Sequence, residues 1–138
     1  MIDRDDLATL LRQALAIAVA DDGASAREAG VSAAEWTLLR VLHAAGAVAP
    51  SVLAEHAGLT RGAVTKLVDR LRAKRLVVRA RGAGDRRFQT IALTGAGASL
   101  VAGLAARRIE PFARLTAAER AELAAGLRAA IASARAAS

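Results

Sequence analysis

The sequence contains no cysteine, no tyrosine, few aromatic residues and no long apolar run. Without cysteine the chain forms no disulfide, thiolate metal site or thiol redox switch, and a reducing compartment suits it. No segment approaches the roughly 18 apolar residues of a membrane-spanning helix. The acidic start at residues 3–6 lacks the basic region of a signal peptide. We therefore expect a soluble, cytoplasmic protein.

Side chains suited to catalysis and metal binding are also scarce. The two histidines, His43 and His56, stand 13 positions apart with no cysteine to complete a metal site. No glycine-rich phosphate loop, nucleophile elbow or cluster of histidine and carboxylate is present. We expect neither an enzyme nor a bound metal or cofactor.

Alanine and positive charge are abundant instead. The hydrophobic fraction is 54% but the aromatic fraction is only 2%, and alanine is the strongest helix former. The net charge is +7, and residues 61–87 contain ten basic against two acidic residues. Because such a concentration repels itself, it favours a polyanionic partner, and a solvated helix face is the alternative.

Periodicity and capping signals predict one mainly α-helical domain over residues 1–138, with a small β hairpin. Capping boxes at Ser32 and Thr116 indicate helix starts, and Gly58 indicates a helix end. A break is predicted over residues 21–30. The expected helices span residues 5–20, 32–46, 50–58, 60–74, 94–109 and 116 onward, and the strands span 76–81 and 88–93.

The segment from Leu53 to Leu67 has the spacing of a helix-turn-helix. The small Ala54 lets the two helices approach, and Gly58 tolerates a positive φ in the turn. The second helix has an apolar stripe for the core, formed by Val64, Leu67, Val68 and Leu71. A purely structural helical hairpin would share this pattern. The residues on the exposed face of the second helix therefore distinguish a DNA-binding helix-turn-helix from such a hairpin.

That exposed face combines small, hydrogen-bonding and cationic residues. A helix in the major groove needs small residues for close approach, polar groups for base edges and cations for phosphates. The face consists of Gly62, Thr65, Lys66, Asp69, Arg70 and Ala73, with Arg61 at the amino end. The basic hairpin that follows is predicted to be a wing with an arginine for the minor groove. The alternative is a winged-helix module for protein or RNA, which would expose apolar or aromatic residues.

This succession of features resembles the MarR (multiple antibiotic resistance regulator) family. Its most specific part is Asp85-x-Arg87 followed by Leu93-Thr94-x-x-Gly97, and the likeness runs from Ser32 to the last helix. The resemblance implies a winged helix-turn-helix lobe in residues 32–97, with dimerisation helices in residues 1–30 and 98–138.

The resemblance also implies a function. It indicates a ligand-responsive regulator, usually a repressor, that binds a pseudo-palindromic double-stranded operator as a homodimer. Two recognition helices about 34–36 Å apart would read successive major grooves. Apolar stripes on the terminal helices agree with a dimer, and their packing within the monomer is the alternative.

The family's DNA-binding positions transfer onto specific residues of this chain. We expect Asp85 and Arg87 to brace the wing by pairing, which leaves Arg86 to enter the groove. Ala49 stands where a capping Ser or Thr is usual. Either Ser51 contributes a cap locally, or the helix start is less firmly capped, at a cost of about 1 kcal/mol in stability. The predicted set is Ser51, Thr60, Arg61, Gly62, Thr65, Lys66, Arg70, Asp85, Arg86 and Arg87.

The resemblance further implies a small aromatic or anionic effector, bound between the dimer helices and the DNA-binding lobe. Such a ligand would change DNA affinity by preferring one spacing of the recognition helices. Trp36 and Arg40, one helical turn apart, are candidates for an apolar wall and a cation. A core position for Trp36 is the alternative. Leu11 and Arg12 are further candidates.

Overall fold

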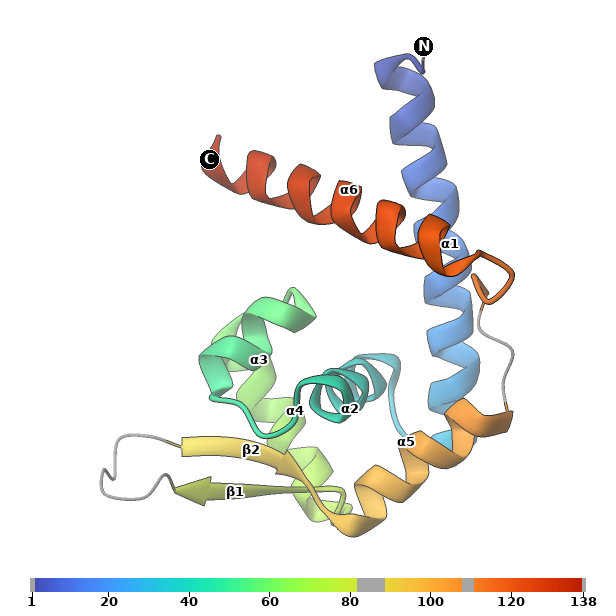
Figure 1. Ribbon diagram of the computed structural model, residues 1–138. Helices are drawn as coiled ribbons and strands as arrows, with labels where there is room; N and C mark the ends of the chain where they lie inside the picture. Colours follow the sequence, from blue (N-terminus) through green and yellow to red (C-terminus); the bar gives the residue numbers. More distant parts are fainter. Residues whose placement is uncertain (1, 82–88, 108–110, 138) are drawn as a thin grey trace. The chain divides into compact units, whose positions relative to one another are not determined.

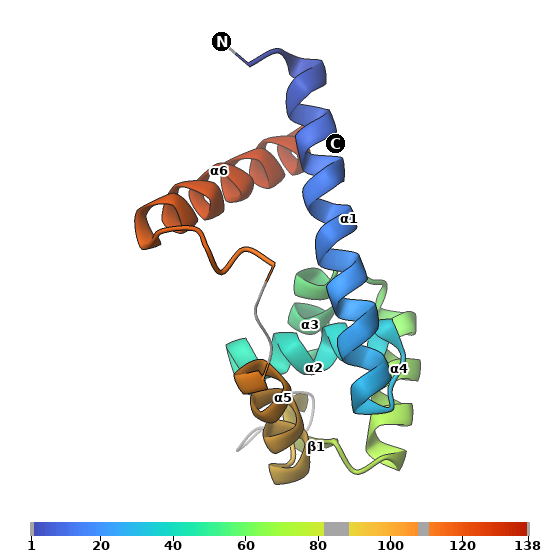
Figure 2. The same ribbon diagram turned by 90° about the vertical axis from the view of Figure 1, so that its right-hand side faces the viewer.

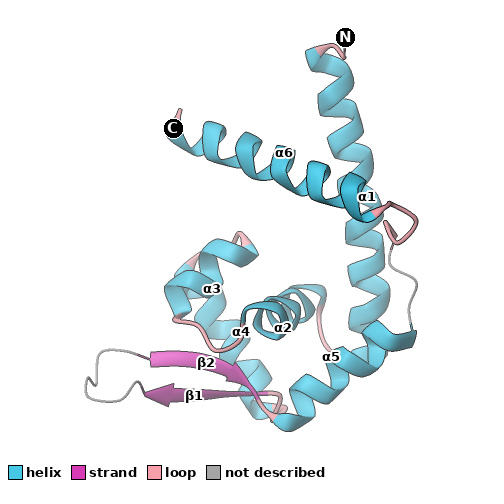
Figure 3. Ribbon diagram, viewed as in Figure 1, coloured by secondary structure: helices cyan, strands magenta, loops and turns pink. Residues whose placement is uncertain are grey.

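The computed structural model describes residues 2–81, 89–107 and 111–137. It confirms a mainly α-helical fold with one small antiparallel sheet (Figures 1 and 3). The chain forms two compact units, residues 1–108 and 109–138. The elements are α1 (Arg4–Ala29), α2 (Ala33–Ala45), α3 (Pro50–Ala57), α4 (Arg61–Ala73), β1 (Val77–Arg81), β2 (Gln89–Leu93), α5 (Gly95–Arg107) and α6 (Ala117–Ala136).

Local capping signals set the helix boundaries as predicted. The Ser32 hydroxyl accepts from the Glu35 amide at 3.1 Å, and the Glu35 carboxylate accepts from the Ser32 amide at 3.4 Å. Thr116 forms the same capping box at the start of α6. Gly58 ends α3 with φ 68°. The start of α3 has no side-chain cap, so Ser51 does not replace the missing one.

The predicted break at residues 21–30 is wrong. α1 continues to Ala29 and ends at Gly30, whose φ is 72°. The last turns of α1 bury Ser25 and Ala26 in the lobe, so tertiary packing offsets the roughly 1 kcal/mol that Gly23 costs in a helix.

The core of the first unit forms around α2, which contacts α1, α3, α4, α5 and β2 (Figure 2). Leu38 and Leu39 of α2 are fully buried. The apolar stripe of α4 is buried as predicted, and α5 adds Val101 and Leu104. The helix-turn-helix is therefore held by its apolar side, which leaves the opposite side of α4 in solvent.

The hairpin lies beside the helix-turn-helix (Figure 1). β1 and β2 pair antiparallel from Val77 opposite Leu93 to Arg81 opposite Gln89. The loop between α2 and α3 joins this sheet, since Val48 and Ile91 exchange backbone hydrogen bonds of 3.1 and 2.7 Å. The base of the predicted wing is thus attached to the lobe. Residues 82–88, which include Asp85, Arg86 and Arg87, lie outside the described residues.

The terminal helices keep apolar side chains exposed. The first half of α1 projects away from the helical lobe of its unit (Figures 1 and 2). Its exposed apolar residues are Leu7, Leu10, Leu11, Leu15, Ile17 and Val19, and those of α6 are Leu123, Leu127 and Ile131. In the described part of the chain, no helix combines the length and apolar character needed to cross a membrane.

Candidate nucleic-acid interface

The exposed face of α4 gathers the DNA-binding residues predicted for this helix. Thr60 caps the helix, because its hydroxyl accepts from the Ala63 amide at 3.1 Å. Since the apolar stripe faces the core, the polar side chains on the other side of α4 reach solvent. The exposed residues are Thr60, Arg61, Gly62, Thr65, Lys66, Asp69, Arg70 and Ala73. Ser51, in the first turn of α3, is exposed as well.

Two features make the amino-terminal part of α4 suited to close contact. A Cβ added to Gly62 would meet nothing within 4 Å, so the surface there is open. The Thr65 hydroxyl donates to the Arg61 carbonyl at 3.0 Å, and its lone pairs stay available to a donor from outside. A partner can therefore approach the backbone closely and find a hydrogen-bonding group beside it.

The charge of this face is organised around Asp69. Its carboxylate accepts from Arg79 of β1 at 3.0 Å and lies 3.9 Å from Arg72. Within the described ranges, Arg61, Lys66 and Arg70 have no acidic partner. Asp69 thus links α4 to β1, while these three cations remain available to an anionic partner.

Lys74, a further cation of the basic segment 61–87, does not join this cationic face, because its ammonium is engaged on the side of α1 and α2. Its Nζ lies 2.9 Å from Oε2 of Glu35 and 3.3 Å from the Gly30 carbonyl oxygen. The Glu35 side chain is only 5% exposed, and a carboxylate so buried needs a cation close by. That demand arises from tertiary packing, and no sequence spacing signals it.

The environment of Glu35 affects its ionisation. Burial of the carboxyl group raises its pKa, but hydrogen bonds from Lys74 and Ser32 and the attraction of the ammonium outweigh burial. The pKa of Glu35 is therefore below its ordinary value of 4.5. The Glu35 carboxyl group is therefore ionised at neutral pH.

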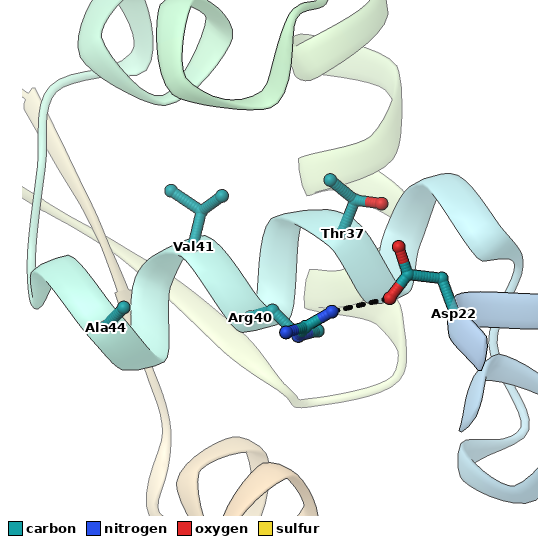
Figure 4. Close-up of a pocket in the computed structure, with 5 residues that line it drawn as sticks. All are labelled: Asp22, Thr37, Arg40, Val41 and Ala44. Carbon is teal, nitrogen blue, oxygen red and sulfur yellow. Dashed lines mark hydrogen bonds and ion pairs between the residues drawn. The ribbon is translucent and has the colours of Figure 1, made fainter. Parts of the chain in front are cut away.

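A hollow of about 260 Å³ lies beside α2 (Figure 4). Arg40 lines it and pairs with Asp22 of α1 at 2.6 Å. The other lining residues are Thr37, Val41 and Ala44. Thr37 and Ala44 lie at helical spacing from Arg40, and Val41 lies four residues after Thr37, so periodicity could have indicated them. The wrongly predicted break hid Asp22.

The remaining effector candidates do not line this hollow. Trp36 is in the core at 4% exposure, as the alternative prediction had it. Its Nε1 is buried with no hydrogen-bond partner in the described part of the protein. Leu11 and Arg12 are exposed on α1.

Known proteins resemble this chain in sequence and in fold. The model of the MarR family matches residues 29–87. The chain is 25% identical to BpsR of Bordetella bronchiseptica, whose DNA binding is regulated by 6-hydroxynicotinic acid, with a TM-score of 0.65 over 88% of this chain and 96% of that one. No curated protein sequence matches the chain.

Two further solved structures share the fold. NadR, solved with 4-hydroxyphenylacetate, is 24% identical, with a TM-score of 0.74 over 90% of this chain and 89% of that one. A MarR family regulator from Neisseria meningitidis is 21% identical, with a TM-score of 0.76 over 98% and 95%. The likeness in fold thus extends over nearly the whole chain.

Proposed function

We propose that this chain, whose residues 29–87 match the model of the MarR family, is a winged helix-turn-helix transcription regulator of that family and acts as a cytoplasmic, ligand-responsive repressor. It binds a pseudo-palindromic double-stranded operator as a homodimer. The recognition helix is α4, and the wing formed by β1 and β2 reaches the adjacent minor groove. No cofactor is needed for this function.

The observation that carries the proposal is the exposed face of α4. Arg61, Lys66 and Arg70 are exposed cations, and Gly62 and Thr65 supply close approach and hydrogen bonding between them. Phosphate contacts would position the helix, and polar contacts to base edges would select the sequence. A protein-docking or RNA-binding helix would present apolar or aromatic side chains here.

The proposal is tested with DNA fragments selected from the source genome on the purified protein. Arg70→Ala and Arg86→Ala should each weaken binding to the selected duplex by roughly tenfold or more. Arg4→Ala removes the same charge from an exposed site at the start of α1 and is the matched control. Fluorescence anisotropy gives the affinities, and circular dichroism verifies the fold. Unchanged binding by both variants would contradict the proposal.

Salt dependence distinguishes DNA recognition from docking to a protein. Because phosphates release counterions when cations neutralise them, the logarithm of affinity should fall linearly with the logarithm of salt, with a slope of about −0.9 per phosphate. Lys66→Met should reduce the slope by about one per subunit. A flat salt dependence would favour the protein-docking alternative.

The exposed apolar residues of α1 and of α6 support the homodimer. Large apolar side chains exposed along a helix mark an association surface when they gather on one side. On α6, Leu123, Leu127 and Ile131 recur every four residues and share one face. We propose that a second copy of the chain covers these apolar residues, as the resemblance to the MarR family implies.

The hollow beside α2 supports an effector site. Arg40 offers a cation to an anionic ligand, whose carboxylate would compete with Asp22, and Val41 offers apolar surface. Trp36 lies one turn before Arg40 but in the core, so it belongs to the proposed site only if ligand binding opens a path to its buried, unpaired Nε1. Leu11 and Arg12 belong to the proposed site only if the dimer brings them to it.

Two aromatic acids named for similar proteins serve as probes for this site. We expect 4-hydroxyphenylacetate or 6-hydroxynicotinate to weaken operator binding by the wild-type protein. Arg40→Met should remove the response. Arg4→Met, which replaces an exposed arginine of α1 far along the chain, should keep it. A response that survives Arg40→Met would place the effector elsewhere.

A further inference from the structure

Lys74 connects three elements that are distant in the sequence. It is the C-cap residue of α4, and its ammonium donates to Glu35 in the first turn of α2 at 2.9 Å. The same ammonium donates to the carbonyl of Gly30, which caps α1, at 3.3 Å. We call these three residues the Lys74 junction. The junction holds the end of α4 against the corner between α1 and α2.

The junction is a stiff connection because its surroundings are packed. The Glu35 side chain is 5% exposed, so its carboxylate would be left charged and desolvated without the ammonium. On the α1 side, Ser25 and Ala26 are buried, and on the α4 side Leu71 is fully buried one turn before Lys74. Glu35 cannot move away without disturbing the core, and withdrawal of the partly exposed Lys74 ammonium would leave the buried carboxylate unpaired.

The two helices that Lys74 joins have different tasks in the proposed function. α1 carries exposed apolar residues for the dimer, and α4 carries the DNA-binding face. In a two-fold dimer, the position of α4 relative to α1 sets the distance between the two recognition helices. That distance determines which separation of half-sites both helices can reach.

We propose that Lys74 is a positioning residue that sets the half-site spacing accepted by the dimer, by fixing the recognition helix α4 to the dimerisation helix α1 through Glu35 and Gly30. This inference rests on the proposed function. It assigns Lys74 a role different from that of Lys66, although both lysines lie in the same basic segment. Lys66 faces solvent from the DNA-binding side, whereas Lys74 faces the α1–α2 corner.

The test measures spacing preference rather than affinity alone. Duplexes carry the half-site selected by the wild-type dimer, with the two half-sites at the selected separation or moved by one or two base pairs. The readout is the ratio of Kd for the altered spacing to Kd for the selected one. Lys74→Met removes the ammonium but keeps a long stem, Lys74→Arg keeps a cation, and Lys66→Met is the matched control.

Loss of the junction should relax the preference. For Lys74→Met, the Kd ratio should fall by about threefold to tenfold, which lies within the range by which residues that link two sites change their coupling. Lys74→Arg should retain most of the wild-type ratio. Lys66→Met should weaken binding to every duplex by the same factor and leave the ratio unchanged, because a phosphate contact does not depend on spacing.

Other outcomes separate this inference from the proposed function. If Lys74→Met does not fold, Glu35→Gln gives the same test, since its amide still accepts from Ser32 but has no charge. A wild-type ratio retained by the folded variant overturns the positioning role and leaves the regulator intact. A wild-type protein that binds all spacings equally, or no duplex, overturns the proposed dimeric regulator and this inference with it.

Discussion

The carbonyl group of Leu76 occupies the space that a Cβ on Gly97 would need. Its carbon lies 3.1 Å from that position, its oxygen is closer still, and both belong to the backbone. The same carbonyl accepts from the Thr94 amide at 3.0 Å, and the Thr94 hydroxyl accepts from the Gly97 amide at 3.1 Å. The start of α5 is thereby held against the corner between α4 and β1.

Gly97→Ala should therefore destabilise the protein strongly. The methyl group meets backbone atoms that cannot rotate away, and we expect a loss of about 2 kcal/mol or more in the free energy of unfolding. Gly103→Ala, on the same helix, meets nothing within 4 Å and should stabilise α5 by up to about 1 kcal/mol. Urea unfolding measures both. Equal stability of the two variants would show that the Leu76 contact does not constrain the fold.

The backbone conformation of Arg75 is predicted to lower the stability of the protein. Its φ is 62°, a conformation that favours glycine, and it follows α4 where the Leu76 amide donates back to Leu71 at 3.0 Å. Arg75→Gly should raise the free energy of unfolding by up to about 1 kcal/mol. The control Arg72→Gly lies inside α4 and should lower it by about 1 kcal/mol. A destabilised Arg75→Gly would mean that the arginine side chain contributes more than its backbone costs.

The pair of Glu35 and Lys74 predicts a pH dependence of stability. Because the pKa of Glu35 is lowered in the folded protein, the unfolded chain binds more protons at acidic pH. The pair therefore stabilises the fold above pH 4.5, the ordinary pKa, and this contribution is lost as the pH falls through the folded pKa. Unfolding by urea between about pH 3 and pH 6 should show a flatter profile for Glu35→Gln.

Lys74→Met should diminish that contribution. Burial raises the pKa of Glu35, and without the ammonium the hydrogen bond and the charge attraction from Lys74 no longer oppose it, so the folded pKa rises and less stability is lost as the pH falls. The relative stability of this variant should then improve on acidification. A profile parallel to that of the wild-type protein would argue that Lys74 does not stabilise the charged carboxylate.

The apolar face of α6 predicts a specific effect on assembly. Leu127→Glu places a charge in the middle of the exposed row of Leu123, Leu127 and Ile131, and it should shift the protein from dimer to monomer in sedimentation experiments. Ala125→Glu adds the same charge at an exposed position on a different side of α6 and should leave the dimer intact. A Leu127→Glu protein that sediments as the wild type would assign the association surface elsewhere.

Much of this protein follows from short stretches of its sequence, because the interactions involved are local. The capping boxes at Ser32 and Thr116 and the glycine at 58 determine helix ends through bonds within one turn. The stripe and the polar face of α4 follow from helical geometry alone. The sequence by itself therefore determined the helix-turn-helix and most of its predicted DNA-binding face.

Contacts between distant segments decided the rest. Asp22 and Gly23 read locally as a break, yet α1 continues because its last turns are buried in the lobe. Lys74 reads as one more cation of a basic segment, yet its ammonium pairs with Glu35, which lies 39 residues earlier and is buried beside it. Burial and the cost of a desolvated charge depend on which segments meet, so only the tertiary structure decided these positions.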